Sequence, residues 1–177
     1  NEIRKHIPIV YLNIWDDYPA PLYNKEFYES CDALFGISKQ TVNINKLVLG
    51  DKAQYKIIEY VPHGVSEDNF RPLSESELGS KEFTEFKNQM FQGKECLLLM
   101  HTQPVEEHGT DLNAVVELFC SEDHINVHFT GGMLDHTRMN WLYNLADTCI
   151  LLTSNEGWGL SLTEALLSGT TIIANVT

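Results

Sequence analysis

Residues 148–174, TCILLTSNEGWGLSLTEALLSGTTIIA, contain two short apolar runs separated by a glycine-bearing turn and a helical segment. The first run covers residues 148–153 and the second covers 170–174, while the helical segment, 161–168, is followed by a glycine. This order of strand, turn, helix and strand predicts a βαβ unit with two parallel strands. In such a unit the turn lies at the carboxyl end of the sheet, where open α/β folds bind their ligands.

The turn of this unit combines backbone access with carboxylates. Gly157 and Gly159 let the backbone approach a ligand without a Cβ atom, and the helix that follows offers N–H groups to a phosphate. Glu156 and Glu164 repel a phosphate, so we expect them to accept hydrogen bonds from the hydroxyls of a ribose or a hexose. The alternative is structural, because Ser161 and Glu164 also fit a Ser-x-x-Glu capping box.

The remaining sequence repeats the alternation of strand and helix patterns. Strands are predicted for residues 7–12, 33–37, 56–61, 96–101 and 125–129, and helices for 22–31, 38–49, 83–91, 112–119 and 137–146. The run 7–12, IPIVYL, is typical of a strand buried on both faces. Residues 62–73, PHGVSEDNFRPL, have neither a helical nor a strand period and predict a linker between one unit at 1–61 and another at 74–177.

Composition and charge exclude several classes of protein. The chain has 177 residues, of which 43% are hydrophobic and 21% charged, as in an ordinary globular protein and unlike a disordered one. Its 12 Lys and Arg residues against 25 Asp and Glu residues give a formal net charge of −13. Because Lys and Arg supply most of the affinity for phosphate backbones, we expect no nucleic-acid partner.

Cysteine usage and hydropathy indicate the compartment. Cys31, Cys96, Cys120 and Cys149 lie far apart in the sequence, and three of them border apolar runs, as reduced core cysteines do. No apolar stretch approaches the roughly 20 residues that span a bilayer, and the first residues lack the apolar core of a signal peptide. We therefore expect a cytoplasmic location.

Several segments resemble motifs of the retaining glycosyltransferases of the GT-B fold, family 4 in particular. The residues that match its E-x7-E signature are Ser154, Glu156, Gly157, Gly159, Leu160, Glu164, Ala165, Gly169 and Ile172. Trp158 takes the place of the usual aromatic residue, and Thr171 that of a proline. Further matches, in the family's order, are CDALFGISK (31–39), VPHGV (61–65) with FRP (70–72), VHFTG (127–131) and WLYNLAD (141–147).

The resemblance implies a GT-B-like α/β fold, with two Rossmann-like parallel-sheet halves and a cleft at the linker. Residues 1–61 would be the last part of the N-terminal acceptor domain, and 74–177 an incomplete domain that binds a nucleotide sugar. The implied activity is transfer of a hexose, from a UDP or GDP sugar for example, to an acceptor hydroxyl with retention at the anomeric carbon. The implied partners are a nucleotide diphosphate sugar and a glycan, lipid or protein acceptor in glycan biosynthesis, with no metal and no further cofactor. Peripheral membrane contact would use segments outside this chain.

The resemblance also implies roles in donor binding for individual residues. Glu164 would bind the ribose hydroxyls of the donor, and Glu156 would act as a catalytic residue that holds a hydroxyl of the donor sugar. The backbone N–H groups that would meet the sugar and the diphosphate belong to Gly157, Trp158, Gly159 and Leu160.

Two further pairs of residues are candidates outside the glycine-bearing turn. The resemblance gives Asp16 or Asp17 a catalytic position that faces the reacting sugar carbon, although a solvated turn explains both residues as well. In the linker, His63 and Gly64 would lie beside the donor, and the alternative for His63 is a turn cap.

One departure from the family leaves the activity open. The family grips the diphosphate with an Arg and a Lys in the first βα unit of its C-terminal domain. Either residues 97–112 are that unit, with His101-Thr102 and His108 in place of the basic residues, or they are the second unit and the first is missing, which we favour. Alternatives to a transferase are therefore a non-catalytic nucleotide-sugar-binding or scaffolding subunit and another GT-B enzyme, such as a sugar-nucleotide epimerase.

The same stretch is rich in metal-ligand residue types. His101, His108, Glu106, Glu107 and Asp111 lie close together in the sequence. Their spacing matches no structural zinc pattern, and a polar loop after a strand explains them. We expect no metal site.

Overall fold

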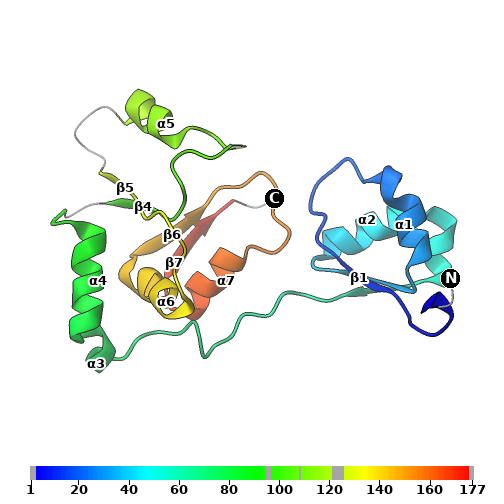
Figure 1. The fold of residues 1–177 in the computed structure, drawn as a ribbon, viewed down its shortest axis with the longest axis horizontal. Helices are drawn as coiled ribbons and strands as arrows, with labels where there is room; N and C mark the ends of the chain where they lie inside the picture. Colours follow the sequence, from blue (N-terminus) through cyan, green and yellow to red (C-terminus); the bar gives the residue numbers. More distant parts are fainter. Residues whose placement is uncertain (1–2, 95–96, 108, 121–125, 176–177) are drawn as a thin grey trace.

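The computed structural model describes residues 3–94, 97–107, 109–120 and 126–175, which form two α/β halves joined by an extended segment (Figure 1). The predicted residues Cys96, His108 and Ile125 lie outside the described ranges. All paired strands in both halves are parallel, as the alternation of strands and helices predicts. No helix within the described ranges is both long and apolar enough to cross a bilayer.

The N-terminal half contains one three-stranded sheet in the order β1-β2-β3. Its strands are β1 (Val10–Asn13), β2 (Ala33–Gly36) and β3 (Ile57–Tyr60). Its helices are η1 (Ile3–Lys5), η2 (Leu22–Asn24), α1 (Lys25–Ser30), α2 (Lys39–Leu49) and η3 (Gly50–Tyr55). The predicted start of α2 is confirmed, because the Ser38 hydroxyl accepts a hydrogen bond from the Thr41 N–H at 3.0 Å. Gly50 ends α2 with a positive φ of 57°.

The core of this half lies on one face of the sheet. The buried side chains are Tyr28, Cys31, Leu34, Ile44, Val48 and Leu49. The prediction that the first strand is buried on both faces is wrong, because Val10 is 52% and Leu12 44% exposed. Successive strand residues point to opposite faces, and α1 and α2 cover only the face to which Tyr11 and Asn13 contribute.

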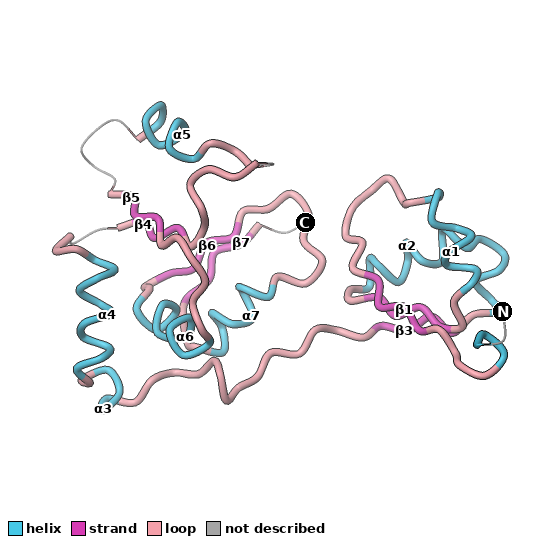
Figure 2. The backbone as a smooth tube through the Cα atoms, in the orientation of Figure 1, coloured by secondary structure: helices cyan, strands magenta, loops and turns pink. Residues whose placement is uncertain are grey.

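The C-terminal half contains two separate strand pairs (Figure 2). One pair joins β4 (Leu98–Met100) to β5 (Val127–Phe129), and the other joins β6 (Thr148–Leu151) to β7 (Thr171–Ala174). The helices are α3 (Glu75–Leu78), α4 (Lys81–Phe91), α5 (Leu112–Phe119), α6 (His136–Leu145) and α7 (Leu160–Leu167). All the predicted strands and helices are present, with shifts of one to a few residues at their ends.

Two small clusters form the core of this half. One centres on Phe86, Met90 and Leu142, with Trp141 packed edge-on against Phe86 at 5.6 Å between ring centroids. The other centres on Phe70, Tyr143 and Ala165. The predicted amphipathic helix at 112–119 forms as α5, but it leaves Leu118 71% and Phe119 75% exposed.

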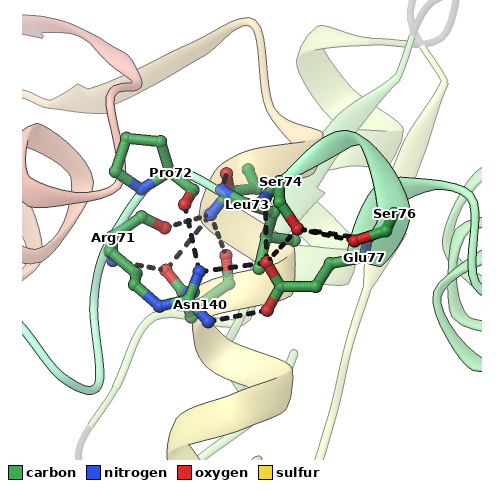
Figure 3. Close-up of polar contacts among 8 residues, drawn as sticks. Arg71, Pro72, Leu73, Ser74, Ser76, Glu77 and Asn140 are labelled. Carbon is green, nitrogen blue, oxygen red and sulfur yellow. Dashed lines mark hydrogen bonds and ion pairs between the residues drawn. The ribbon is translucent and has the colours of Figure 1, made fainter.

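The segment between the halves is fastened to the C-terminal half at its far end. The Arg71 N–H donates to Asn140 Oδ1 at 3.1 Å and the Leu73 N–H to Asn144 Oδ1 at 2.8 Å, so both amides bond to α6 (Figure 3). Phe70 is only 4% exposed and belongs to the core there. Residues 70–73 therefore pack as part of the C-terminal half.

Glu77 bonds to Arg71 and Ser74 beside this attachment, and these bonds change the pKa of its carboxyl group. Its carboxylate accepts hydrogen bonds from the Arg71 guanidinium and from Ser74, as part of a capping box at the start of α3 (Figure 3). These bonds, the one from Arg71 above all, lower the pKa of Glu77 from 4.5 to about 2. A carboxylate whose pKa falls on folding stabilises the fold above its unfolded pKa, and this stability is lost as the pH falls to the folded value.

We therefore expect Glu77→Gln to flatten the decline of stability between pH 4.5 and about 2. The effect is small and salt-dependent, because the pair is exposed to solvent. Urea unfolding of the parent and the variant across this pH range measures it. Glu75→Gln on the same helix is the control, and a Glu77→Gln profile parallel to that of the parent would contradict the expectation.

Candidate functional site

The loop that carries the two glycines touches the other half of the molecule. It follows β6, and Gly157 is buried. A Cβ atom built on Gly157 would lie 2.7 Å from Ile37 Cδ1 and 3.3 Å from Asp16 Cβ. Asp16 follows β1 and Ile37 follows β2. The carboxyl ends of strands from both halves therefore meet at this loop, and in open α/β folds these ends are where ligands bind.

Gly157 and Gly159 are each required for a different structural reason. At Gly157 the contact with Asp16 and Ile37 leaves no room for a side chain. Gly159 has a φ of 76° and is the N-cap residue of α7. L-residues with a side chain rarely adopt that conformation, so Gly159 allows the chain to turn directly into the helix.

Glu156 closes onto the start of α7. Its Oε1 accepts a hydrogen bond from the Gly159 N–H at 2.9 Å, while much of the side chain stays exposed. A carboxylate at a helix N-terminus is stabilised by the partial positive charge there. Glu156 thus lies within the loop between β6 and α7, residues 152–159, which we call the motif loop. One of its carboxylate oxygens bonds to the backbone of this loop.

Glu164 bonds to a side chain of the neighbouring helix. Its Oε2 accepts a hydrogen bond from the Tyr143 hydroxyl at 2.8 Å. The alternative of a capping box at Ser161 is wrong, because α7 begins at Leu160 with Gly159 as its N-cap, which places Ser161 inside the first turn. The pKa of Tyr143 is raised, first by burial and then by the bond to the Glu164 carboxylate. Its hydroxyl is therefore a donor at neutral pH.

Asp16 and Asp17 lie in a loop that α2 holds in place. The Thr41 hydroxyl donates to the Trp15 carbonyl at 3.0 Å, and the Gln40 amide donates to the Asp16 carbonyl at 3.2 Å. Asp16 is half-buried beside Gly157, whereas Asp17 is exposed and its carboxylate accepts from the N–H of Tyr18. The structure thus brings Asp16, and not Asp17, to the motif loop.

The remaining candidates differ in how they relate to the loop. Trp158 Nε1 is buried and has no hydrogen-bond partner within the described part of the chain. An unpaired buried N–H is costly, so this group would gain from an acceptor on a ligand. His63 is half-buried and Gly64 exposed, and among the described residues no hydrogen bond joins either of them to the motif loop.

The metal-ligand residue types that follow β4 form no cluster in the described ranges. No group of three or more His, Cys, Asp or Glu residues there could hold a metal ion. His101 directly follows β4 and its Nδ1 lies 2.7 Å from Oγ1 of Thr130, which directly follows β5, so this ring links the ends of the two strands. A cavity of about 250 Å³ lies nearby, lined by α4 and β5 and by Arg138, and it contains no residue of the motif loop.

Comparison with solved structures identifies the architecture. Over 98% of its length the chain superposes on sucrose-phosphate synthase of Thermosynechococcus elongatus, with a TM-score of 0.63 and 15% identity. Over 94% it superposes on Anabaena HepE, solved in complex with UDP and glucose, with a TM-score of 0.66 and 12% identity. The chain has a GT-B fold. It spans about half the length of both structures, 52% in each case.

Sequence comparisons add no family. No family model matches the chain, and no curated protein matches it. The GT-B fold therefore rests on the structure and not on sequence similarity.

Tyr143 is the site residue that sequence reasoning did not assign. It lies within the segment WLYNLAD (141–147), which is compared above with a motif, so a signal was present. The pattern alone does not show that its hydroxyl meets Glu164 on another helix.

Proposed function

We propose that the chain belongs to a retaining glycosyltransferase that moves a hexose from a nucleotide diphosphate sugar to an acceptor hydroxyl without a metal. The observation that carries the proposal is the contact of Gly157 with Asp16, which joins the E-x7-E loop to the opposite half. In this proposal residues 1–61 belong to the acceptor domain and 74–177 to the donor domain, with 62–73 as the linker, of which residues 70–73 pack against the donor domain. The acceptor is a hydroxyl of a glycan, a lipid or a protein, and the setting is cytoplasmic.

The donor would lie along the start of α7. Glu164 accepts the two ribose hydroxyls, and Glu156 turns away from the Gly159 N–H to accept a hydroxyl of the transferred sugar. The N–H groups of Gly157, Trp158 and Leu160 face the sugar and the diphosphate, together with that of Gly159 when Glu156 turns to the sugar. His63 and Gly64 line the linker side. The buried indole N–H of Trp158 supports a ligand with hydrogen-bond acceptors at this place.

Asp16 would act on the reacting carbon from the other half. Its side chain lies beside Gly157, so a sugar held next to it by the loop would have the Asp16 carboxylate close by. A fixed negative charge there stabilises the positive charge that develops at the anomeric carbon as the bond to the diphosphate breaks. Asp17, which is exposed, would have at most an indirect part.

The leaving diphosphate has little basic support in this chain. Residues 148–174 contain no Lys or Arg, and the basic residues after position 73 are Lys81, Lys87, Lys94 and Arg138. The N-terminus of α7 supplies partial positive charge, and an amino-terminal helix end favours a phosphate. His101 stands at the end of β4 and is engaged with Thr130. This favours, as a second candidate function, a subunit that binds a nucleotide sugar without transferring it.

The test is a thermal-shift panel of UDP, GDP, ADP and their common sugar conjugates with the full chain. A ligand at 100 times its Kd adds about 2.7 kcal/mol of stability, which is readily measured. We expect stabilisation by the nucleotides of one base and not of the others. Donor hydrolysis or transfer then separates the enzyme from the binding subunit, and epimerised sugar would identify an epimerase. An absence of stabilisation across the panel would contradict the proposal.

A further inference from the structure

The pair formed by Tyr143 and Glu164 has a fixed donor and a partly used acceptor. Tyr143 lies on α6, is 6% exposed and donates from its hydroxyl to Glu164 Oε2 at 2.8 Å. Glu164 Oε1 accepts no hydrogen bond from any side chain or backbone group within the described ranges. Each carboxylate oxygen accepts up to two hydrogen bonds, so Glu164 retains capacity on both oxygens.

The Tyr143 ring is held on two sides. The ring of Phe70 packs against it with 6.0 Å between centroids and an interplanar angle of 66°. The backbone carbonyl of Tyr143 accepts a hydrogen bond from the Thr170 hydroxyl at 2.6 Å, and Thr170 is also buried. The hydroxyl is therefore presented to Glu164 by a side chain whose ring and backbone are both fixed.

A free glutamate side chain on a helix samples several rotamers and loses that freedom when it binds a ligand. A hydrogen bond from a fixed tyrosine removes this freedom before binding. The carboxylate plane is then set in advance for two neighbouring hydroxyl groups, and less of the binding energy is lost to ordering. No other side-chain donor to Glu164 is present in the part of the chain that the structure describes.

We propose that Tyr143 is the positioning residue of the nucleotide site: its hydroxyl fixes the Glu164 carboxylate so that it receives the 2′- and 3′-hydroxyls of the ribose. The assignment rests on the proposed function. It predicts that Tyr143 contributes to the choice of a ribonucleotide over a deoxynucleotide without touching the ligand.

The experiment measures Kd for UDP, GDP and ADP and for their 2′,3′-dideoxy forms by calorimetry on the full chain. We expect the parent to prefer the ribonucleotide that it binds by about tenfold or more. Tyr143→Phe removes only the hydroxyl and is expected to reduce this preference about three- to tenfold. Tyr28→Phe is the matched control, because Tyr28 is 1% exposed and its hydroxyl also bonds to a side chain, Asn13, in the other half.

Two further variants test whether Tyr143 acts through Glu164. In a Glu164→Ala background, Tyr143→Phe is expected to cause no further change in the preference, since coupled residues are not additive. Glu164→Asp withdraws the carboxylate from Tyr143 by one methylene group and is expected to reduce the preference as Tyr143→Phe does. Thermal unfolding of each variant reports its folding.

Three other results would overturn the assignment of Tyr143. A Tyr143→Phe protein that is less stable but keeps the parent's preference would make Tyr143 a structural residue and overturn the assignment. A parent that binds both nucleotide forms equally would also overturn it, while nucleotide binding stands. A parent that binds no nucleotide would overturn the proposed function, and the assignment with it.

Discussion

Gly159→Val is expected to abolish nucleotide binding. Gly159 has a φ of 76° at the N-cap of α7, and its N–H donates to Glu156. A β-branched residue is strongly disfavoured there, and the strain costs about 1–3 kcal/mol if the backbone stays in place. Relief of that strain would rotate the first turn of α7 and displace the N–H groups that are proposed to meet the donor.

The measurement is a titration with the nucleotide found by the thermal-shift panel, together with thermal unfolding. Gly159→Asn is the control, because Asn tolerates the left-handed conformation and adds a Cβ atom at the same place. A Cβ atom there has only ordinary contacts, at 3.5 Å from Glu156 Cγ and Leu162 Cδ1. We therefore expect the Asn variant to keep its fold. A Val variant that binds as the parent does would contradict the role of this turn.

Glu164→Ala is expected to weaken nucleotide binding by about 1–3 kcal/mol, which is roughly a 5- to 150-fold rise in Kd. The reason is the loss of the charged acceptor of two ribose hydroxyls. The variant also leaves the Tyr143 hydroxyl without its partner, so a lower unfolding temperature is expected as well.

Affinity and stability must therefore be measured separately for this variant. Glu117→Ala on α5 removes the same charge from an exposed position and serves as the control. An unchanged affinity together with lower stability would show that Glu164 serves only to pair with Tyr143. The proposed nucleotide site would then lack the residue proposed to bind the ribose hydroxyls.

Local signals in the sequence predicted most of the fold. Ser38 before an apolar-periodic segment and Gly50 after it mark both ends of α2, because caps depend only on near neighbours in the chain. The exposure of Val10 could not be predicted in this way. An all-apolar strand is compatible with burial on both faces, and which faces are covered depends on helices elsewhere in the fold.

Residues of the candidate site could be named from motifs and from the family resemblance, whereas the contacts between distant segments could not. The glycines and glutamates of the motif loop could be named from the sequence. A Ser-x-x-Glu pattern at Ser161 predicted a cap, but the positive φ of Gly159 starts the helix earlier. The proximity of Asp16 to Gly157 and the bond between Tyr143 and Glu164 join separate elements, so no local pattern contains them.

The attachment of residues 70–73 to α6 shortens the tether between the halves. The Val61 N–H still bonds to the Gly36 carbonyl at the end of the first sheet, and Phe70 is already in the second core. Only residues 62–69 remain between these points, and at about 3.5 Å per residue they reach roughly 28 Å. A tether this short keeps Asp16 at a high effective concentration beside the motif loop. Under the proposed function, the two halves therefore need little intrinsic affinity for each other to meet at the donor site.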